Sequence, residues 1–420
     1  LLVSFLLSIS PWHLQFSRGA FEVNSGLFLL VWGAVFLLWG TVKPGFLLLS
    51  AVFYSLSLYA YHSSRIFVPL FLLGVFIIYR DKFLAVRKYL AVAVIIGIIM
   101  SLPALFIMIS PEGRQRLAGV SIYTDQTGLL RDNVIKIDQD NAVNNKFANL
   151  LHNRRLTYVE RFIEGYLWHF TPIWLFLNGD GVGRHHAPDM GLLYLIELPF
   201  VLLGLYKLLG AKEKEKYIVL LWFLLPALAG APTNQVPHAI RSYYFLPVFQ
   251  IFTALGIISA VKNFQSDKIR QMLIFVTVLL YSANFTYYLD AYFRHFPYEY
   301  AKHWQYGYKE AIAATQSLED KYHRIIFSGK LEQPYIYYLF YTKYDPSVYL
   351  AKGGSKEIDF NNWSHLKLDK YEFKLFNWNE EINRNNTLYI GRPADFPGGV
   401  KIIKTISYPN GEPAMVLVEG

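Results

Sequence analysis

The stretch YLAVAVIIGIIMSLPALFIMI, residues 89–109, decides the fold class because its 21 residues include no charged side chain. A helix that crosses a membrane needs about 20 predominantly apolar residues. Seven further apolar runs lie at residues 25–41, 45–61, 66–79, 190–209, 217–231, 243–261 and 271–289. The runs at 66–79 and 217–231 are short, which leaves tilted, partly re-entrant or longer helices open. We therefore predict an α-helical polytopic membrane protein with about eight membrane helices in residues 1–290.

The composition supports a chain embedded in lipid. Of the 420 residues, 54% are hydrophobic and only 17% are charged, whereas soluble domains carry about 25% charged residues. The net charge of +9 could suggest a nucleic-acid partner, but many of the basic residues flank apolar runs. This placement favours a lipid bilayer as the partner and argues against nucleic acid. The absence of cysteine excludes disulfides and thiolate metal sites.

The first residues, LLVSFLLSI, are apolar and have no basic leader. A secretory signal peptide begins with a positively charged segment, so this stretch does not fit one. We interpret it as the end of a membrane helix, a stub whose beginning is expected upstream of residue 1.

The short connections between the runs differ in charge. The connections at 42–44, 80–88, 210–216 and 262–270 contain Lys43, Arg80, Lys82, Arg87, Lys88, Lys212, Lys214, Lys216, Lys262, Lys268 and Arg270. The alternating connections at 10–24, 62–65 and 232–242 contain only Arg18, Arg65 and Arg241. Basic residues concentrate in short cytoplasmic loops. The second set, the long loop 110–189 and the C-terminal residues are therefore expected outside the cytoplasm of a multi-pass plasma-membrane protein.

Two segments of the outer side are too long for simple connectors. In the loop 110–189, residues 146–177 are rich in aromatic residues with interspersed Arg and His, which suits helices in the membrane interface or a loop packed on helix ends. Residues 291–420 predict a soluble α/β domain. We expect helices at 298–320 and 333–343, and strands at 323–328, 387–390, 400–408 and 414–418.

Ionisable residues are scarce within the apolar runs, where only Glu197 and Lys207 occur. Ion-coupled transporters usually place such groups at mid-membrane, so their scarcity argues against a coupled transporter. Glu197 could line a cavity, but a hydrogen bond to a neighbouring helix is the favoured interpretation.

Four polar clusters occur at the outward ends of the predicted helices. They are SPWHLQFSRGAFE (10–22), YAYHSSR (59–65), NGDGVGRHHAPD (178–189) and PHAIR (237–241). Each contains Arg and His, and guanidinium groups pair well with phosphate. The clusters therefore predict a site for a lipid phosphate, with candidate binding residues His13, Arg18, His62, Arg65, Asp180, Arg184, His185, His238 and Arg241. The alternative is that these side chains anchor helices among lipid headgroups.

The same clusters resemble segments of the GT-C superfamily of polytopic glycosyltransferases, in particular the dolichyl-phosphate-mannose protein mannosyltransferase and aminoarabinose transferase group. The matching patterns are S-P-x-H-x-x-x-S-R-x-A-x-E at 10–22, Y-x-Y-x-x-x-R-x-x-x-P at 59–69, N-G-D-x-x-x-R-H within 178–191 and P-H-A-x-R-x-x-x-x-x-P at 237–247. These loose patterns span roughly residues 1–290.

The resemblance implies an inverting transfer of a sugar from a polyprenyl-phosphate carrier to a protein, lipid or glycan acceptor at the outer face. It also implies a catalytic acidic loop upstream of residue 1 and a second acidic position at Glu22. A structural salt bridge between Glu22 and Arg18 is the alternative role for this residue. Residues 168–174 could stack on sugar or anchor the chain in the interface.

No cofactor or metal is expected from the sequence. His185 and His186, beside Asp180 and Asp189, could bind a divalent metal, but adjacent histidines usually point in different directions. Two other functions stay open: a flippase or transporter of a lipid-linked saccharide, and a non-catalytic membrane subunit whose outer domain binds a partner.

Overall fold

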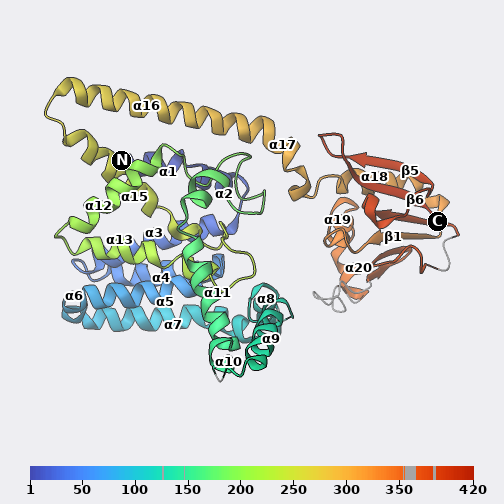
Figure 1. Ribbon diagram of the computed structural model, residues 1–420, viewed down its shortest axis with the longest axis horizontal. Coiled ribbons are helices and arrows are strands. Elements are labelled where there is room, and N and C mark those ends of the chain that lie inside the picture. Colours follow the sequence, from blue (N-terminus) through green and yellow to red (C-terminus); the bar gives the residue numbers. More distant parts are fainter. Residues whose placement is uncertain (125–126, 146, 353, 355–365, 382–384) are drawn as a thin grey trace. The chain divides into compact units, whose positions relative to one another are not determined.

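A computed structural model describes residues 1–420 except 125–126, 146, 353, 355–365 and 382–384 (Figure 1). The chain divides into two compact units, Leu1–Leu289 and Asp290–Gly420. The first unit is helical, and the second contains a six-stranded sheet.

The first unit contains a run of helices that overlap all eight predicted apolar segments. They are α1 (Leu2–Ser8), α2 (Pro11–Arg18), α3 (Glu22–Gly40), α4 (Phe46–Ala60), α5 (Ser64–Ile78), α6 (Arg80–Ala85), α7 (Arg87–Ile109), α8 (Pro111–Val120), α9 (Thr127–Ala142), α10 (Ala148–Leu151), α11 (Arg154–Trp168), η1 (Ile173–Asn178), α12 (Glu197–Gly210), α13 (Glu215–Leu224), α14 (Ala227–Gly230), η2 (Tyr243–Phe245), α15 (Val248–Lys262) and α16 (Asp267–Asp290).

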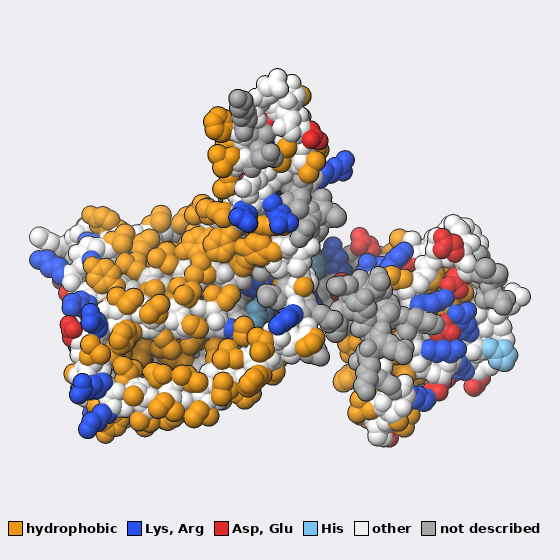
Figure 2. Space-filling view, turned by 90° about the horizontal axis from the view of Figure 1, so that it is seen from below, with side chains coloured by type: hydrophobic (Ala, Val, Ile, Leu, Met, Phe, Trp, Pro, Cys, Tyr) orange, Lys and Arg blue, Asp and Glu red, His pale blue; other side chains and the backbone are white. Residues whose placement is uncertain are grey.

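Among the described residues, four helical segments are long and apolar enough to cross a membrane: Glu22–Gly40, Arg87–Ile109, Tyr243–Lys262 and Asp267–Glu299. Much of their apolar surface faces outward, as at Ile95, Ile99 and Phe106, which are 55%, 61% and 65% exposed. Hydrophobic side chains cover a broad face of the helical unit, and Lys and Arg gather at one of its ends (Figure 2). A surface of this size and polarity suggests membrane association. A count of eight crossings stays a prediction.

Small residues allow the helices to pack closely. On α3, Gly33 lies against the ring of Tyr54 on α4, and its carbonyl accepts a hydrogen bond from Ser50 Oγ at 2.9 Å. Glu197 is buried, and Thr253 of α15 donates a hydrogen bond to its carboxylate at 3.4 Å. The predicted bond to a neighbouring helix is thereby confirmed, although Glu197 begins α12 instead of lying two turns inside it.

Three expectations about the helical unit were wrong in detail. The run 190–209 is helical only from Glu197, and the run 217–231 is interrupted between α13 and α14, where Pro226 lies. Proline has no N–H to donate inside a helix, which favours such a break. The outer loop 110–189 also contains more helix than its polar sequence suggested, because α8 and α9 precede the aromatic-rich part.

The second unit is an α/β domain with the sheet order β2-β3-β1-β4-β6-β5. Strand β1 pairs in parallel with β3 and β4, whereas β2, β5 and β6 run antiparallel to their neighbours. The elements are η3 (Ala291–His295), α17 (Phe296–Glu299), η4 (Ala301–Trp304), α18 (Tyr308–Leu318), η5 (Glu319–Lys321), β1 (Arg324–Ser328), α19 (Pro334–Tyr341), α20 (Pro346–Ala351), β2 (Leu366–Leu368), β3 (Tyr371–Lys374), β4 (Thr387–Gly391), η6 (Pro393–Asp395), β5 (Ile402–Ser407) and β6 (Pro413–Glu419).

The predicted strands and the second predicted helix of this unit are confirmed as β1, β4, β5, β6 and α19. The single helix expected at 298–320 is wrong, because the chain breaks between η4 and α18. Gln305 and Gly307 have φ of 50° and 95° there, and a helix cannot continue through that conformation. The hairpin of β2 and β3 was missed, since its turn is made by Asp369 at φ 56° and not by glycine.

Candidate functional site

Hydrogen bonds join the four polar clusters, which are far apart in the sequence. They are called here the first (10–22), second (59–65), third (178–189) and fourth (237–241) polar segments. The Gln15 side chain donates to the carbonyl of Arg184 at 2.8 Å, which links the first segment to the third. The backbone N–H of Ala239 donates to Asp180 Oδ2 at 2.7 Å, which links the third to the fourth. The Ser63 hydroxyl donates to the carbonyl of Arg241 at 2.7 Å, which links the second to the fourth.

Two tyrosines of η2 strengthen this assembly. The Tyr243 hydroxyl donates to Asn24 Oδ1 at 2.8 Å, and the Tyr244 hydroxyl lies 2.7 Å from Ser64 Oγ. Gly26 leaves the room that the Tyr244 hydroxyl occupies beside α3. The first turn of α3 and the start of α5 are therefore held against η2, which follows the fourth polar segment.

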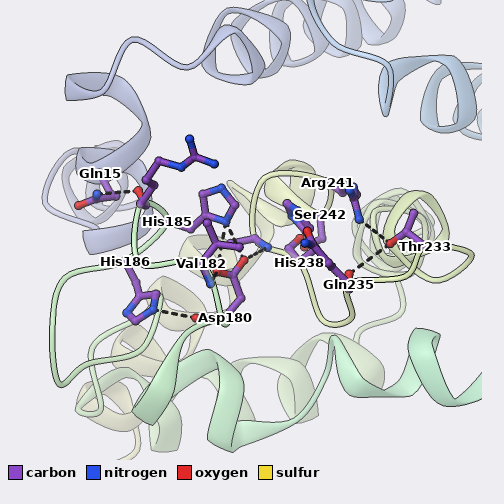
Figure 3. Close-up of polar contacts among 12 residues, drawn as sticks. Gln15, Asp180, Val182, His185, His186, Thr233, Gln235, His238, Arg241 and Ser242 are labelled. Carbon is purple, nitrogen blue, oxygen red and sulfur yellow. Dashed lines mark hydrogen bonds and ion pairs between the residues drawn. The ribbon is translucent and has the colours of Figure 1, made fainter. Parts of the chain in front are cut away.

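Asp180 is the centre of the third segment (Figure 3). Its carboxylate accepts hydrogen bonds from the backbone N–H groups of Val182 at 3.0 Å and Ala239 at 2.7 Å, and from His185 Nδ1 at 2.8 Å. Burial alone would raise the pKa of Asp180, but the hydrogen bond and charge of His185 and the Ala239 N–H outweigh it and lower the pKa. The group is thus a buried, ionised carboxylate that joins two loops.

Two histidines lie close to this carboxylate. The rings of His185 and His238 are 5.0 Å apart between centroids, and both side chains are buried. Asp180, His185 and His238 each offer one potential ligand atom, and these atoms all lie within 4.8 Å of one another. Burial, followed by the positive charge of Arg241, lowers the pKa of His238 to about 3. His238 is therefore a neutral imidazole at neutral pH.

Arg241 lies deeper than the sequence suggested. It is buried, and its guanidinium donates a hydrogen bond to Thr233 Oγ1 at 2.7 Å. His169, also buried, accepts the N–H of His238 at 3.2 Å through Nε2, which leaves Nδ1 to donate to the carbonyl of Gly165 at 2.7 Å. These contacts give Arg241 a role in holding the fourth segment in addition to any role in binding an anion.

The remaining predicted residues lie at the edge of this assembly. Arg18 ends α2 and Glu22 begins α3, and both side chains are exposed. The two residues are therefore not on one helix, as the salt-bridge alternative assumed. His13, His62, Arg65 and Arg184 are half-buried. Burial lowers the pKa of His13.

The two adjacent histidines point in different directions, as predicted. His185 faces the Asp180 carboxylate, whereas His186 contacts the carbonyl oxygens of Ala187 and Asp180 at 2.9 Å each. Asp189 is exposed. The histidine that lies beside Asp180 and His185 is His238, which comes from the fourth polar segment. The Asp180–Ala239 hydrogen bond joins these two segments across 59 residues of sequence.

An apolar cavity of about 370 Å³ lies between helices α3, α4, α5 and α7. Its walls include Leu58, Val68 and Ser101. Arg65 is close to one end, because its Nε donates to the carbonyl of Leu58 at 3.3 Å. The cavity therefore places an apolar volume beside a basic residue of the second polar segment.

Several residues of the site escaped the sequence analysis. These are Gln15, Ser63, Ser64, His169, Thr233 and Tyr244. Most lie at unspecified positions inside the quoted patterns, so their only signal was their position within or near an Arg-bearing segment. His169 lies in the aromatic segment after α11, where interfacial anchoring seemed sufficient to explain it.

No protein-family model matches the chain, and the curated proteins contain no significant match. The function is therefore inferred from the residues of the site.

Proposed function

We propose that this protein is a multi-pass membrane glycosyltransferase that moves a sugar from a polyprenyl-phosphate carrier to an acceptor at the outer face of the plasma membrane. The observation that carries the proposal is the joining of four Arg- and His-bearing segments into one hydrogen-bonded assembly. Segments that only anchored separate helices among headgroups would have no need of hydrogen bonds to one another.

The apolar cavity supports a lipid substrate. A polyprenyl phosphate combines a long hydrocarbon chain with a charged headgroup. The cavity between α4, α5 and α7 offers an apolar volume, and Arg65 stands beside its wall. Apolar burial contributes about 0.8 kcal/mol per CH₂ group, while a guanidinium can pair with phosphate oxygens. One site would thus recognise both parts of the carrier.

The reaction would use the charges of these segments. An acceptor hydroxyl attacks the anomeric carbon, the bond from that carbon to the phosphate oxygen breaks, and the polyprenyl phosphate leaves with the electron pair. Arg18, Arg65 and Arg184 would stabilise the departing phosphate. Glu22, an exposed carboxylate at the first turn of α3, would receive the hydroxyl proton or orient an arginine. The nucleophile enters opposite the leaving group, so the anomeric configuration inverts.

The test uses full-length protein in liposomes with radiolabelled polyprenyl-phosphate mannose, glucose and arabinose, and a membrane extract as the source of acceptors. Wild-type protein should convert one of these donors into polyprenyl phosphate and a labelled acceptor. Arg65→Ala should lower kcat/KM by roughly tenfold or more, because a charge-assisted contact to phosphate contributes about 1.5–3 kcal/mol. Arg80→Ala, an exposed residue at the start of α6, is the matched control and should retain activity.

The same liposomes separate the alternatives. Movement of an intact donor between leaflets, without release of polyprenyl phosphate, would indicate a flippase and refute glycosyl transfer. Neither transfer nor movement with any of the donors would favour a non-catalytic subunit. Equal activity of Arg65→Ala and Arg80→Ala would refute the binding of the donor phosphate by Arg65.

A further inference from the structure

Three potential metal ligands meet at the contact between the third and fourth polar segments. Asp180 and His185 come from the loop after η1, and His238 comes from the loop before η2. Their ligand atoms lie within 4.8 Å of one another, and all three side chains are buried, with 8%, 4% and 5% exposure. A buried carboxylate beside two buried imidazoles is unlike an exposed acidic patch, whose members are solvated.

A second observation concerns His238. Its Nδ1 is buried and has no hydrogen-bond partner among the residues that the structure describes. A buried polar atom without a partner costs about 1–3 kcal/mol. The ring centroid lies 5.0 Å from that of His185, so the His238 side chain is part of the same buried cluster, and its Nδ1 is unsatisfied among the described residues.

The three ligand atoms must shift to surround a cation. In a tetrahedral zinc site with bonds of about 2.0–2.1 Å, neighbouring ligand atoms are about 3.3–3.4 Å apart. His185 Nδ1 lies 2.8 Å from Asp180 Oδ2, so this pair must separate by about half an ångström. Ligand atoms that lie up to 4.8 Å apart must approach by up to about 1.5 Å. The N–H groups of Val182 and Ala239 hold the carboxylate without occupying all of its lone pairs.

We propose that Asp180, His185 and His238 form a binding site for a divalent transition metal of the zinc class. Two imidazole nitrogens and one carboxylate oxygen suit Zn²⁺ or Co²⁺ better than Mg²⁺ or Ca²⁺, which prefer oxygen ligands. Three protein ligands leave a fourth position for water or another oxygen ligand. The charge of Asp180 offsets the repulsion between the cation and Arg241.

The metal would join the third and fourth segments. At present these segments are held together mainly by the Ala239–Asp180 hydrogen bond. A metal that binds only the folded protein stabilises it in proportion to the logarithm of its concentration over Kd. Metal binding is thus measurable without a sugar substrate and does not depend on the proposed glycosyl transfer.

The experiment uses the full chain with an affinity tag that contains no histidine. The protein is stripped with EDTA, dialysed, and titrated with ZnCl₂ and separately with CoCl₂. Calorimetry and elemental analysis give the stoichiometry, and visible absorption of Co²⁺ reports the coordination number. We expect one bound metal per chain, a four-coordinate Co²⁺ spectrum, and a Tm that rises with ZnCl₂.

His238→Ala removes one ligand and should weaken metal binding by at least about tenfold. His323→Ala, an exposed histidine of the second unit, controls for the loss of a histidine and should bind as wild type. Wild-type protein that binds no Zn²⁺, or a His238→Ala variant that binds as tightly as wild type, would overturn the proposal. If His238→Ala does not fold, the Co²⁺ spectrum of wild type decides: a six-coordinate spectrum refutes the site.

Discussion

Replacement of Gly204 by valine tests a close helix contact in the helical unit. Gly204 of α12 and Gly256 of α15 face each other. A Cβ added at Gly204 would lie 2.6 Å from the carbonyl carbon of Phe252 and 3.0 Å from the nitrogen of Gly256. Ordinary contacts between carbon atoms measure about 3.5–4.0 Å. The first added carbon alone therefore overlaps the backbone of α15 by about 1 Å.

The magnitude follows from which atoms must move. The obstructing atoms belong to the backbone of a helix, so no side-chain rotation relieves the contact and the two helices must separate. Overpacking of a core by extra carbons typically costs about 1–3 kcal/mol. Valine has a higher helix propensity than glycine, by less than about 1 kcal/mol. Separation would also lengthen the buried Thr253–Glu197 hydrogen bond, so we expect a net loss of roughly 1–3 kcal/mol in the free energy of unfolding.

The control is Gly210→Val at the end of the same helix, where an added Cβ meets nothing within 4 Å. Both variants are purified in the same detergent, and their unfolding is followed by thermal melting and by titration with denaturant. Gly204→Val should melt several degrees below wild type, while Gly210→Val should melt close to it. Equal melting of the two variants would refute the tight contact between α12 and α15.

Further predictions concern the sheet domain and the third polar segment. Arg324→Ala removes the guanidinium that donates hydrogen bonds to both oxygens of the Glu372 carboxylate, at 2.9 and 2.6 Å. Because that carboxylate is 4% exposed, denaturant unfolding should show a loss of about 1–3 kcal/mol in the free energy of unfolding. Arg294→Ala breaks an ion pair whose arginine is 80% exposed and should change stability by less than about 1 kcal/mol; similar losses in both would contradict this ranking. Gly179→Ala should destabilise the unit, because φ is +66° and a Cβ would lie 2.6 Å from the His186 ring; an unchanged melting curve would refute this.

Local sequence properties fixed several features of the two units. The length of the apolar runs located the helices, and short β-rich runs separated by Gly, Pro and Asn located β1, β4, β5 and β6. Both signals are read from residues that are neighbours in the sequence. Breaks that depend on backbone conformation, as at Gln305, were missed because several residue types can adopt a positive φ.

The contacts within the candidate site could not be predicted from the sequence. The sequence could indicate that Asp180 and His238 each stand in a polar segment, but it could not pair them. Their contact depends on how two loops meet, through the Ala239 N–H and the Asp180 carboxylate. The same dependence explains why His185 joins this carboxylate with its side chain while the adjacent His186 turns to backbone carbonyls.

The sequence by itself determined that the chain carries apolar helices long enough to cross a membrane, that connections rich in basic residues alternate with connections poor in them, and that the C-terminal part contains strands. Each of these properties depends on residues that are consecutive in the sequence. Only the tertiary structure decided which Arg- and His-bearing segments bond to one another and which histidines share one carboxylate. Hydrogen bonds between distant segments require specific loop conformations, and these arise from the packing of the whole helical unit.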